Sequence, residues 1–270
     1  MRFAATFVLI AGAAFAGSAP DPTAAQIDDI ITKFAAKEAE FARVRGNYTY
    51  RQTVKIQELD DNGNPMGKHE MVTDIVFTPE GRRIERVVYA PVDSLKVIGL
   101  TQEDEQDLRD VQPFVLTTSE IPNYYIRYQG REQLDEISCY SFAVKPKAMQ
   151  QGKRYFEGII WVDDKDLQIV KTYGRGIGLL KKNSDYQFPK FETYREQIDG
   201  KYWFPTYTIA NDTLNFKDIS QRIRQTIRYE NYKQFKSDVV IKYGDVTDDP
   251  KDQPKTTTPG QPPAPPKKKQ

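Results

Sequence analysis

The chain has 270 residues, with 39 basic and 38 acidic side chains, which gives a formal net charge of +1 at pH 7. This balance excludes the basic surface excess that nucleic-acid binders need, and the single histidine excludes histidine-rich metal sites. Sixteen Tyr and 14 Phe favour a large β-sheet. Cys139, the only cysteine, cannot form an internal disulfide and is interpreted as a small strand residue.

Residues 1–19 have the pattern of a cleaved signal peptide. One cation, Arg2, precedes an apolar run over residues 3–15, and small residues follow around Ala16. The run is shorter than the roughly 20 apolar residues of a membrane span. The pattern therefore predicts an exported protein, periplasmic or otherwise extracytoplasmic after signal-peptide cleavage.

Residues 23–45 are predicted to form an amphipathic helix. Thr23 and Gln26 have the spacing of a capping box at its start. Apolar residues then recur at helical spacing. A helix that covers a sheet is the favoured interpretation, and a membrane-surface helix is the alternative. The candidate lid residues on this helix are Ile30, Phe34 and Phe41.

From Tyr48 onward the hydrophobic period changes to two, which is typical of strands. Short turn sequences connect the early strands, and short connections of this kind predict an antiparallel meander. About ten strands are predicted in a mainly β (α+β) fold. They cover residues 48–57, 71–77, 83–89, 124–128, 137–145, 155–163, 167–173, 191–198, 202–210 and 223–235.

Two regions depart from the strand pattern. Residues 90–123 contain a short acidic helix over 101–110 and are interpreted as an enlarged lid. Residues 247–270 are rich in Pro and Lys and are expected to form an extended, solvated tail. A contact with an acidic partner or an anionic envelope surface is the alternative role for this tail. The globular domain is predicted to cover residues 20–246.

Most chemical motifs are weak. His69 and Glu70 begin like a zinc-protease helix, but Thr73 stands where a second histidine is needed. The glycines of 174–178 lack the βαβ context of a dinucleotide site and are interpreted as a flexible loop, or alternatively as a mobile gate. The acidic residues of 163–166 are interpreted as a solvated turn rather than a calcium loop. No catalytic residue, metal site or cofactor is predicted.

The abundance of apolar residues in the predicted strands suggests that the sheet encloses an apolar space, and a filled core is the alternative. The candidate cavity residues are Tyr50, Val54, Ile75, Phe77, Phe142, Val144, Ile160, Trp161, Trp203, Tyr207 and Ile209.

Several segments together carry a family resemblance. The predicted leader and helix are followed by the strand sequence Asn-Tyr-Thr-Tyr-Arg-Gln at residues 47–52. A later strand has the sequence Cys-Tyr-Ser-Phe-Ala-Val at residues 139–144. Residues 155–163 end in Trp-Val-Asp, and after a short turn residues 167–171 end in Ile-Val-Lys. This order resembles the outer-membrane lipoprotein-sorting proteins of the LolA/LolB-like fold. The resemblance implies an incomplete antiparallel β-barrel of about 10–11 strands, with a helical lid over an apolar cavity for acyl chains.

The resemblance implies a soluble, monomeric carrier of lipid or lipoprotein acyl chains that contacts membrane surfaces transiently. Sensor domains of envelope-stress sigma-factor regulators are similar, so a lipid-sensing or protein-binding module in the envelope is the alternative. A secreted hydrolase assembled around His69 is a more distant alternative.

Overall fold

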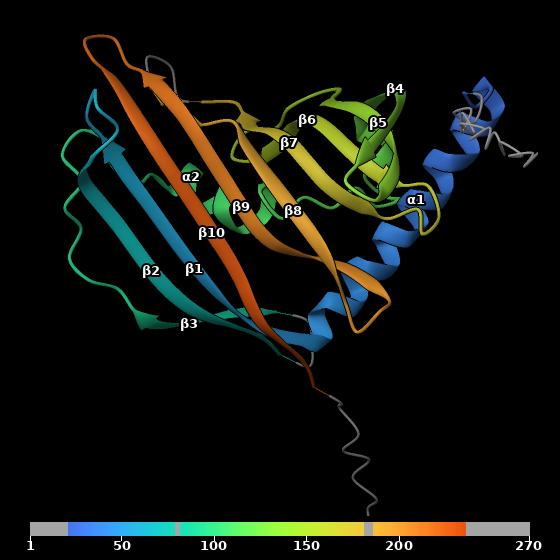
Figure 1. Ribbon diagram of the computed structural model, residues 1–270, viewed down its shortest axis with the longest axis horizontal. Helices are drawn as coiled ribbons and strands as arrows, with labels where there is room; N and C mark the ends of the chain where they lie inside the picture. Colours follow the sequence, from blue (N-terminus) through green and yellow to red (C-terminus); the bar gives the residue numbers. More distant parts are fainter. Residues whose placement is uncertain (1–20, 79–81, 181–185, 236–270) are drawn as a thin grey trace, which may run out of the picture. The chain divides into compact units, whose positions relative to one another are not determined.

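The computed structural model describes residues 21–78, 82–180 and 186–235. The predicted signal peptide and the predicted Pro/Lys tail lie outside these residues. Within them, ten antiparallel strands form one sheet in the order β3-β2-β1-β10-β9-β8-β7-β6-β5-β4 (Figure 1). Almost every sequence neighbour is also a spatial neighbour, as expected for a meander. The exceptions are β3 and β4, which are consecutive in sequence but lie at opposite edges, and β1 and β10, the first and last strands of the chain, which pair in the middle of the sheet.

The predicted strands are found, several of them longer than expected. Their bounds are β1 Tyr48–Leu59, β2 Pro65–Phe77, β3 Arg83–Tyr89, β4 Tyr124–Leu134, β5 Ile137–Pro146, β6 Arg154–Asp163, β7 Ile169–Gly178, β8 Phe191–Ile198, β9 Tyr202–Asn215 and β10 Ser220–Gln234.

The interpretation of residues 174–178 as a flexible loop or gate is wrong, because β7 continues through them to Gly178. The glycines are required by close packing. A Cβ atom on Gly174 would lie 2.3 Å from the carbonyl oxygen of Glu157 and 2.7 Å from the ring of Phe156. On Gly176 it would lie 2.0 Å from the carboxylate of Asp107.

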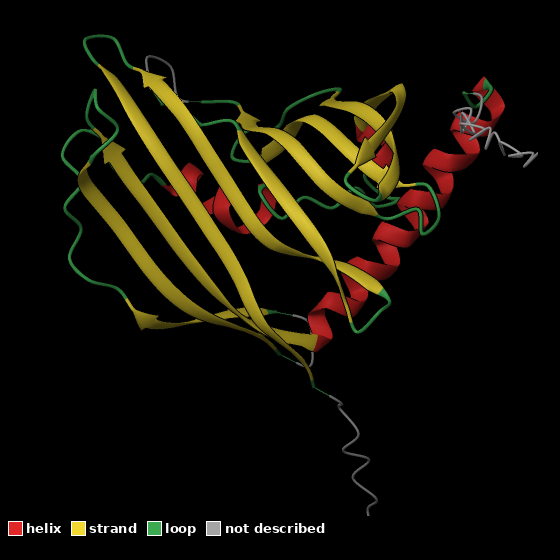
Figure 2. Cartoon of the chain, in the orientation of Figure 1, coloured by secondary structure: helices red, strands yellow, loops and turns green. Residues whose placement is uncertain are grey.

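The sheet does not close, since β3 and β4 are its two edges and do not pair with each other. It curls around the helices, which lie on its concave side (Figure 2). The predicted incomplete barrel with a helical cover is therefore confirmed. No helix in the described part of the chain is long and apolar enough to cross a membrane.

Helix α1, Ala24–Val44, covers one half of the concave face. Its capping box forms as predicted, with Thr23 and Gln26 each bonding the other's backbone amide. Ile30 and Phe34 pack with core residues of β4–β8, and Phe41 packs against Phe204 of β9. The 3₁₀ turn η1, Arg45–Asn47, then leads into β1.

The lid segment, residues 90–123, covers the other half of the concave face. It contains α2 (Gln102–Gln106), the π-helical turn η2 (Asp107–Val111) and the 3₁₀ turn η3 (Ile121–Asn123). Thr101 and Asp104 form a capping box at the start of α2. The amide of Gln112 donates to the carbonyl oxygen of Asp107 at 2.8 Å, which closes the wide turn.

A buried ion pair joins α1 to the sheet. Glu38 on α1 and Arg195 on β8 are 0% and 1% exposed at the side chain, with 3.1 Å between Oε1 and Nη1. The amide of Ile169 also donates to Glu38, and Arg195 donates to the carbonyl oxygen of Phe114 in the lid segment. Burial raises the pKa of Glu38, while Arg195 opposes that rise. The pair therefore connects the sheet, α1 and the lid segment.

The Glu38→Gln substitution should destabilise the protein by about 3–5 kcal/mol, because it leaves the Arg195 charge buried without a counter-charge. Urea unfolding followed by circular dichroism measures this difference. The matched control is Asp29→Asn, which breaks the exposed pair between Asp29 and Lys33 on the same helix and should cost less than about 1 kcal/mol. Equal effects of the two substitutions would contradict the structural role of the buried pair.

Candidate functional site

A pocket of about 430 Å³, here called the lid pocket, lies between the lid segment and the concave face of the sheet. Its floor comes from β1, β8, β9 and β10, and its walls come from the lid segment and from residues 186–189. Most of the lining side chains are apolar. They are Ile56, Val97, Ile98, Leu100, Leu108, Phe188, Pro189, Phe191, Leu214, Phe216 and Ile223.

The wall at residues 96–98 is positioned by Glu58 at the end of β1. Its buried carboxylate accepts hydrogen bonds from the amides of Lys96, Val97 and Ile98 at 2.6–2.8 Å. Three backbone donors satisfy the acceptor capacity of this carboxylate in place of water. The result is an irregular segment that presents Val97 and Ile98 to the pocket.

A second buried contact between an arginine and a carboxyl group joins the lid to the sheet. Arg154 on β6 donates to both carboxylate oxygens of Asp107 on η2, at 2.8 Å from Nε and 2.5 Å from Nη2. The carboxylate lies over Gly176, where no side chain stands in its way. The Arg154 guanidinium also lies 3.8 Å from the ring centre of Phe188, in the opposite wall.

The floor of the pocket also holds the lid by neutral hydrogen bonds. Gln225 of β10 donates to the side chain of Gln112 at 2.8 Å, and the hydroxyl of Thr193 donates to the Gln112 carbonyl oxygen at 2.9 Å. These bonds do not depend on pH. Within η2, Asp107 is the residue that makes an ion pair with the sheet.

Two carboxyl groups of the lid pocket have perturbed protonation. Burial raises the pKa of Asp107 to about 6, although the Arg154 guanidinium acts in the opposite direction. Burial also raises the pKa of Asp104, which is opposed by its hydrogen bonds with Thr101. Both carboxyl groups therefore hold their protons to a higher pH than free carboxyl groups do, and when ionised they disfavour a bound anion.

None of the eleven residues predicted for the cavity lines the lid pocket. Tyr50 and Phe77 line a second, smaller pocket that also includes Phe41 of α1. The remaining inward-facing candidates are buried in the filled part of the core. They are Val54, Ile75, Phe142, Val144 and Ile160.

Four predicted cavity residues lie on the convex face instead. Trp161 and Trp203 pack there with Cys139 and Val170. Tyr207 and Ile209 flank the buried Thr208, whose hydroxyl bonds on the concave side. Because successive strand residues point to opposite faces, these four side chains cannot reach the concave space. The prediction placed these residues on the wrong face because both faces of the sheet carry apolar clusters.

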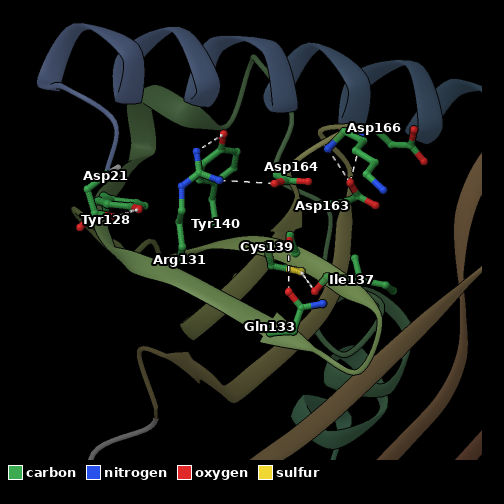
Figure 3. A network of polar contacts seen from close by, with 12 residues as sticks. Asp21, Tyr128, Arg131, Gln133, Ile137, Cys139, Tyr140, Asp163, Asp164 and Asp166 are labelled. Carbon is green, nitrogen blue, oxygen red and sulfur yellow. Dashed lines mark hydrogen bonds and ion pairs between the residues drawn. The ribbon is translucent and has the colours of Figure 1, made fainter. Parts of the chain in front are cut away.

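The acidic turn at residues 163–166 lies near Cys139 in a network of polar contacts (Figure 3). The carboxylate of Asp163 accepts hydrogen bonds from the amides of Lys165 and Asp166, as a turn residue does. Burial raises the pKa of Cys139 to about 12, so its thiol is protonated. Among the described residues, no group of three or more His, Cys, Asp or Glu side chains has metal-site geometry.

His69 lies on β2, with 2.7 Å between its Nδ1 and a carboxylate oxygen of Asp93. The neighbouring Ser94 hydroxyl is engaged with the backbone of Lys68. No contact in the described part of the chain places a nucleophile against the histidine ring.

Sequence reasoning missed the residues that form the pocket walls, 97–101 and 186–189. Both stretches are irregular, so hydrophobic periodicity gives no signal for them. A usable signal was the apolar sequence Val97-Ile98-Gly99-Leu100 inside an otherwise polar segment.

Solved structures similar to this chain were found, whereas no family profile and no curated protein sequence matches it. One is a DUF1329 family protein from Desulfovibrio piger, with 15% identity, a TM-score of 0.42 and coverage of 79% of this chain and 94% of that chain. A LolA superfamily protein from Nitrosomonas europaea has 13% identity, a TM-score of 0.34 and coverage of 77% and 93%.

A putative outer membrane lipoprotein-sorting protein domain from Vibrio parahaemolyticus has 10% identity and a TM-score of 0.33, with coverage of 75% of this chain and 92% of that chain. The lipoprotein-sorting proteins that the sequence resembles are thus found again among solved structures. Similarity at this level concerns the fold and assigns no function.

Raising the pH should loosen the lid. The pKa of Asp107 is raised from 3.8 to about 6 when the lid is docked, so the docked state holds a proton that a solvated carboxyl group releases. This contribution to docking is complete below the unperturbed pKa and is lost as the pH rises through about 6. Hydrogen exchange of residues 102–113, corrected for intrinsic rates, should be faster at about pH 8 than at about pH 5.

The Asp107→Asn variant should lose the larger part of this pH dependence, because the amide does not titrate, and the remainder comes from the raised pKa of Asp104. Asp110→Asn, which changes an exposed carboxyl group on the same turn, should retain it. The same pH dependence in wild type and Asp107→Asn would contradict the assignment.

Proposed function

We propose that the protein is an extracytoplasmic, non-catalytic carrier that binds the acyl chain of a lipid or lipoprotein in the lid pocket. The observation that supports this function is a mainly apolar pocket between a curved sheet and a lid segment. Its volume of about 430 Å³ lies within the usual range for small-molecule sites, roughly 300–1,000 Å³. The predicted signal peptide supports the location.

The energetics suit reversible carriage. Each methylene transferred from water to an apolar site contributes about 0.8 kcal/mol. Ten buried methylenes would therefore contribute about 8 kcal/mol before the cost of ordering the chain is subtracted. Such binding is selective for hydrocarbon and requires no chemical step, so the lid has only to admit and release the chain.

The polar groups of the pocket favour a neutral ligand at this site. Asp104 and Asp107 are the charged acceptors at its edge, and Arg154 is already paired with Asp107. An acyl chain in ester or amide linkage meets no repulsion there, whereas a free carboxylate does. We therefore expect acyl chains of lipids or lipoproteins to bind better than free fatty acids in the lid pocket.

A protein-binding role in the envelope is the second candidate. Edge strand β3 exposes Val87, Val88 and Tyr89, and Val92 beyond it is 96% exposed. A free strand edge with apolar side chains can accept a strand from another protein. Cross-linking from position 88 in envelope extracts should identify one stoichiometric protein if this role holds, and no discrete product if it does not.

Calorimetric titration with 1-monodecanoylglycerol tests the carrier function. The wild-type protein should bind this neutral acyl probe, and Leu100→Asp should weaken binding by at least about tenfold, because a charge then stands in the apolar wall. Val92→Asp makes the same chemical change at a solvent-exposed position and should leave binding unchanged.

Circular dichroism of both variants establishes that they are folded. Absence of binding by the wild-type protein, or equal binding by wild type and Leu100→Asp, would overturn the proposal.

A further inference from the structure

A second pocket lies on the other side of the π-helical turn η2. It has a volume of about 250 Å³ and is lined by Arg45, Arg83 and Arg109, with Asp110 as the one acidic lining residue. We call it the arginine pocket. Its remaining surface is mainly aromatic, formed by Phe41, Tyr50, Phe77, Phe204, Tyr229 and Tyr232.

Two of the three arginines have acidic neighbours. Arg109 lies 3.4 Å from the carboxylate of Asp110, and both side chains are exposed. Arg83 lies 3.1 Å from the carboxylate of Glu85 and donates to Gln52 at 3.0 Å. Even so, the buried Nε of Arg83 has no hydrogen-bond partner within the described ranges.

Arg45 is different, since its guanidinium makes no hydrogen bond or ion pair with any described residue. It is a half-buried residue in η1, at the C-terminal end of α1. The nearby carboxylate of Glu38 is already paired with Arg195. Burial lowers the pKa of Arg45, Tyr50 and Glu38 oppose that change, and the positive charges of Arg195 and Arg83 add to it.

The tyrosines do not neutralise this charge. Burial raises the pKa values of Tyr50, Tyr229 and Tyr232, so their phenols are protonated at neutral pH. The Tyr232 hydroxyl donates to the carbonyl oxygen of Pro205 at 2.6 Å. The aromatic rings give the pocket an apolar surface, while its formal charge comes from the three arginines, Asp110 and the adjacent Glu85.

A half-buried guanidinium without a direct ion-pair partner is costly, and proteins normally pair such groups. Arginine remains protonated, so the charge cannot be relieved by deprotonation. We infer that the arginine pocket binds a small amphiphile whose anionic group, a carboxylate or phosphate, pairs with Arg45 and whose apolar body contacts the aromatic lining.

The opposite polarity of the two pockets separates this inference from the proposed carrier function. The lid pocket has the carboxyl groups of Asp104 and Asp107 at its edge, and the arginine pocket has a surplus of cations. Residues of η2 contribute to both, with Leu108 on one side and Arg109 on the other. The anion site therefore stands whether or not the lid pocket holds an acyl chain.

Calorimetric titration with octanoate, octyl phosphate and octanol tests the anion site. Wild-type protein should bind the two anions at least about tenfold more tightly than octanol, which is a difference of about 1.4 kcal/mol. Arg45→Gln should remove this preference, and Arg45→Lys should restore part of it because the charge returns. Arg43→Gln, an exposed position on the same helix, should keep the full preference.

Two further titrations make the test specific. In the Leu100→Asp protein, which impairs the lid pocket, the preference for octanoate over octanol should persist. Acetate and inorganic phosphate should bind much more weakly than the octyl anions. An anion preference that survives in Arg45→Gln, its absence from the wild type, or equal binding of acetate and octanoate would overturn the inference.

Discussion

The structure depends on the cover over the concave face of the sheet. Because the sheet does not close into a barrel, no opposite wall of strands covers the apolar side chains on that face. Two covers lie on it, and a buried arginine–carboxylate pair anchors each one. Glu38 of α1 meets Arg195 of β8, and Asp107 of the lid meets Arg154 of β6. Apolar packing alone does not fix the register of a helix on a sheet, whereas a buried pair is satisfied in one position. These pairs therefore specify where each cover lies.

The two covers fill the concave face to different extents, and this difference creates the candidate site. Helix α1 has 21 residues and buries Ile30, Phe34 and Phe41 against aromatic strand residues, which leaves a packed core. In the lid segment, the helical part over the pocket consists of α2 and η2, of five residues each. Its buried apolar residues are Leu108 and Val111. A short cover cannot fill the space above four strands, so a pocket remains beneath it. The hollow is a consequence of lid size rather than of sheet composition.

Much of the fold was predictable from the sequence because local signals agree with it. The Thr23–Gln26 capping box and the period-two strands specify α1 and the meander. The site was less predictable, because Trp161 and Trp203 are apolar strand residues that face outward into a second cluster. Composition cannot distinguish two apolar faces of one sheet. The walls of the pocket depend on contacts distant in sequence, such as Glu58 with residues 96–98.

The π-helical turn η2 links the chemistry of the two pockets. Its wider hydrogen-bonded ring places Asp107 and Leu108 toward the lid pocket and Arg109 and Asp110 toward the arginine pocket. Movement of this one turn would change the walls of both pockets together. A ligand that holds η2 against Arg45 would also stabilise the docked lid, because binding to one state shifts the equilibrium toward it.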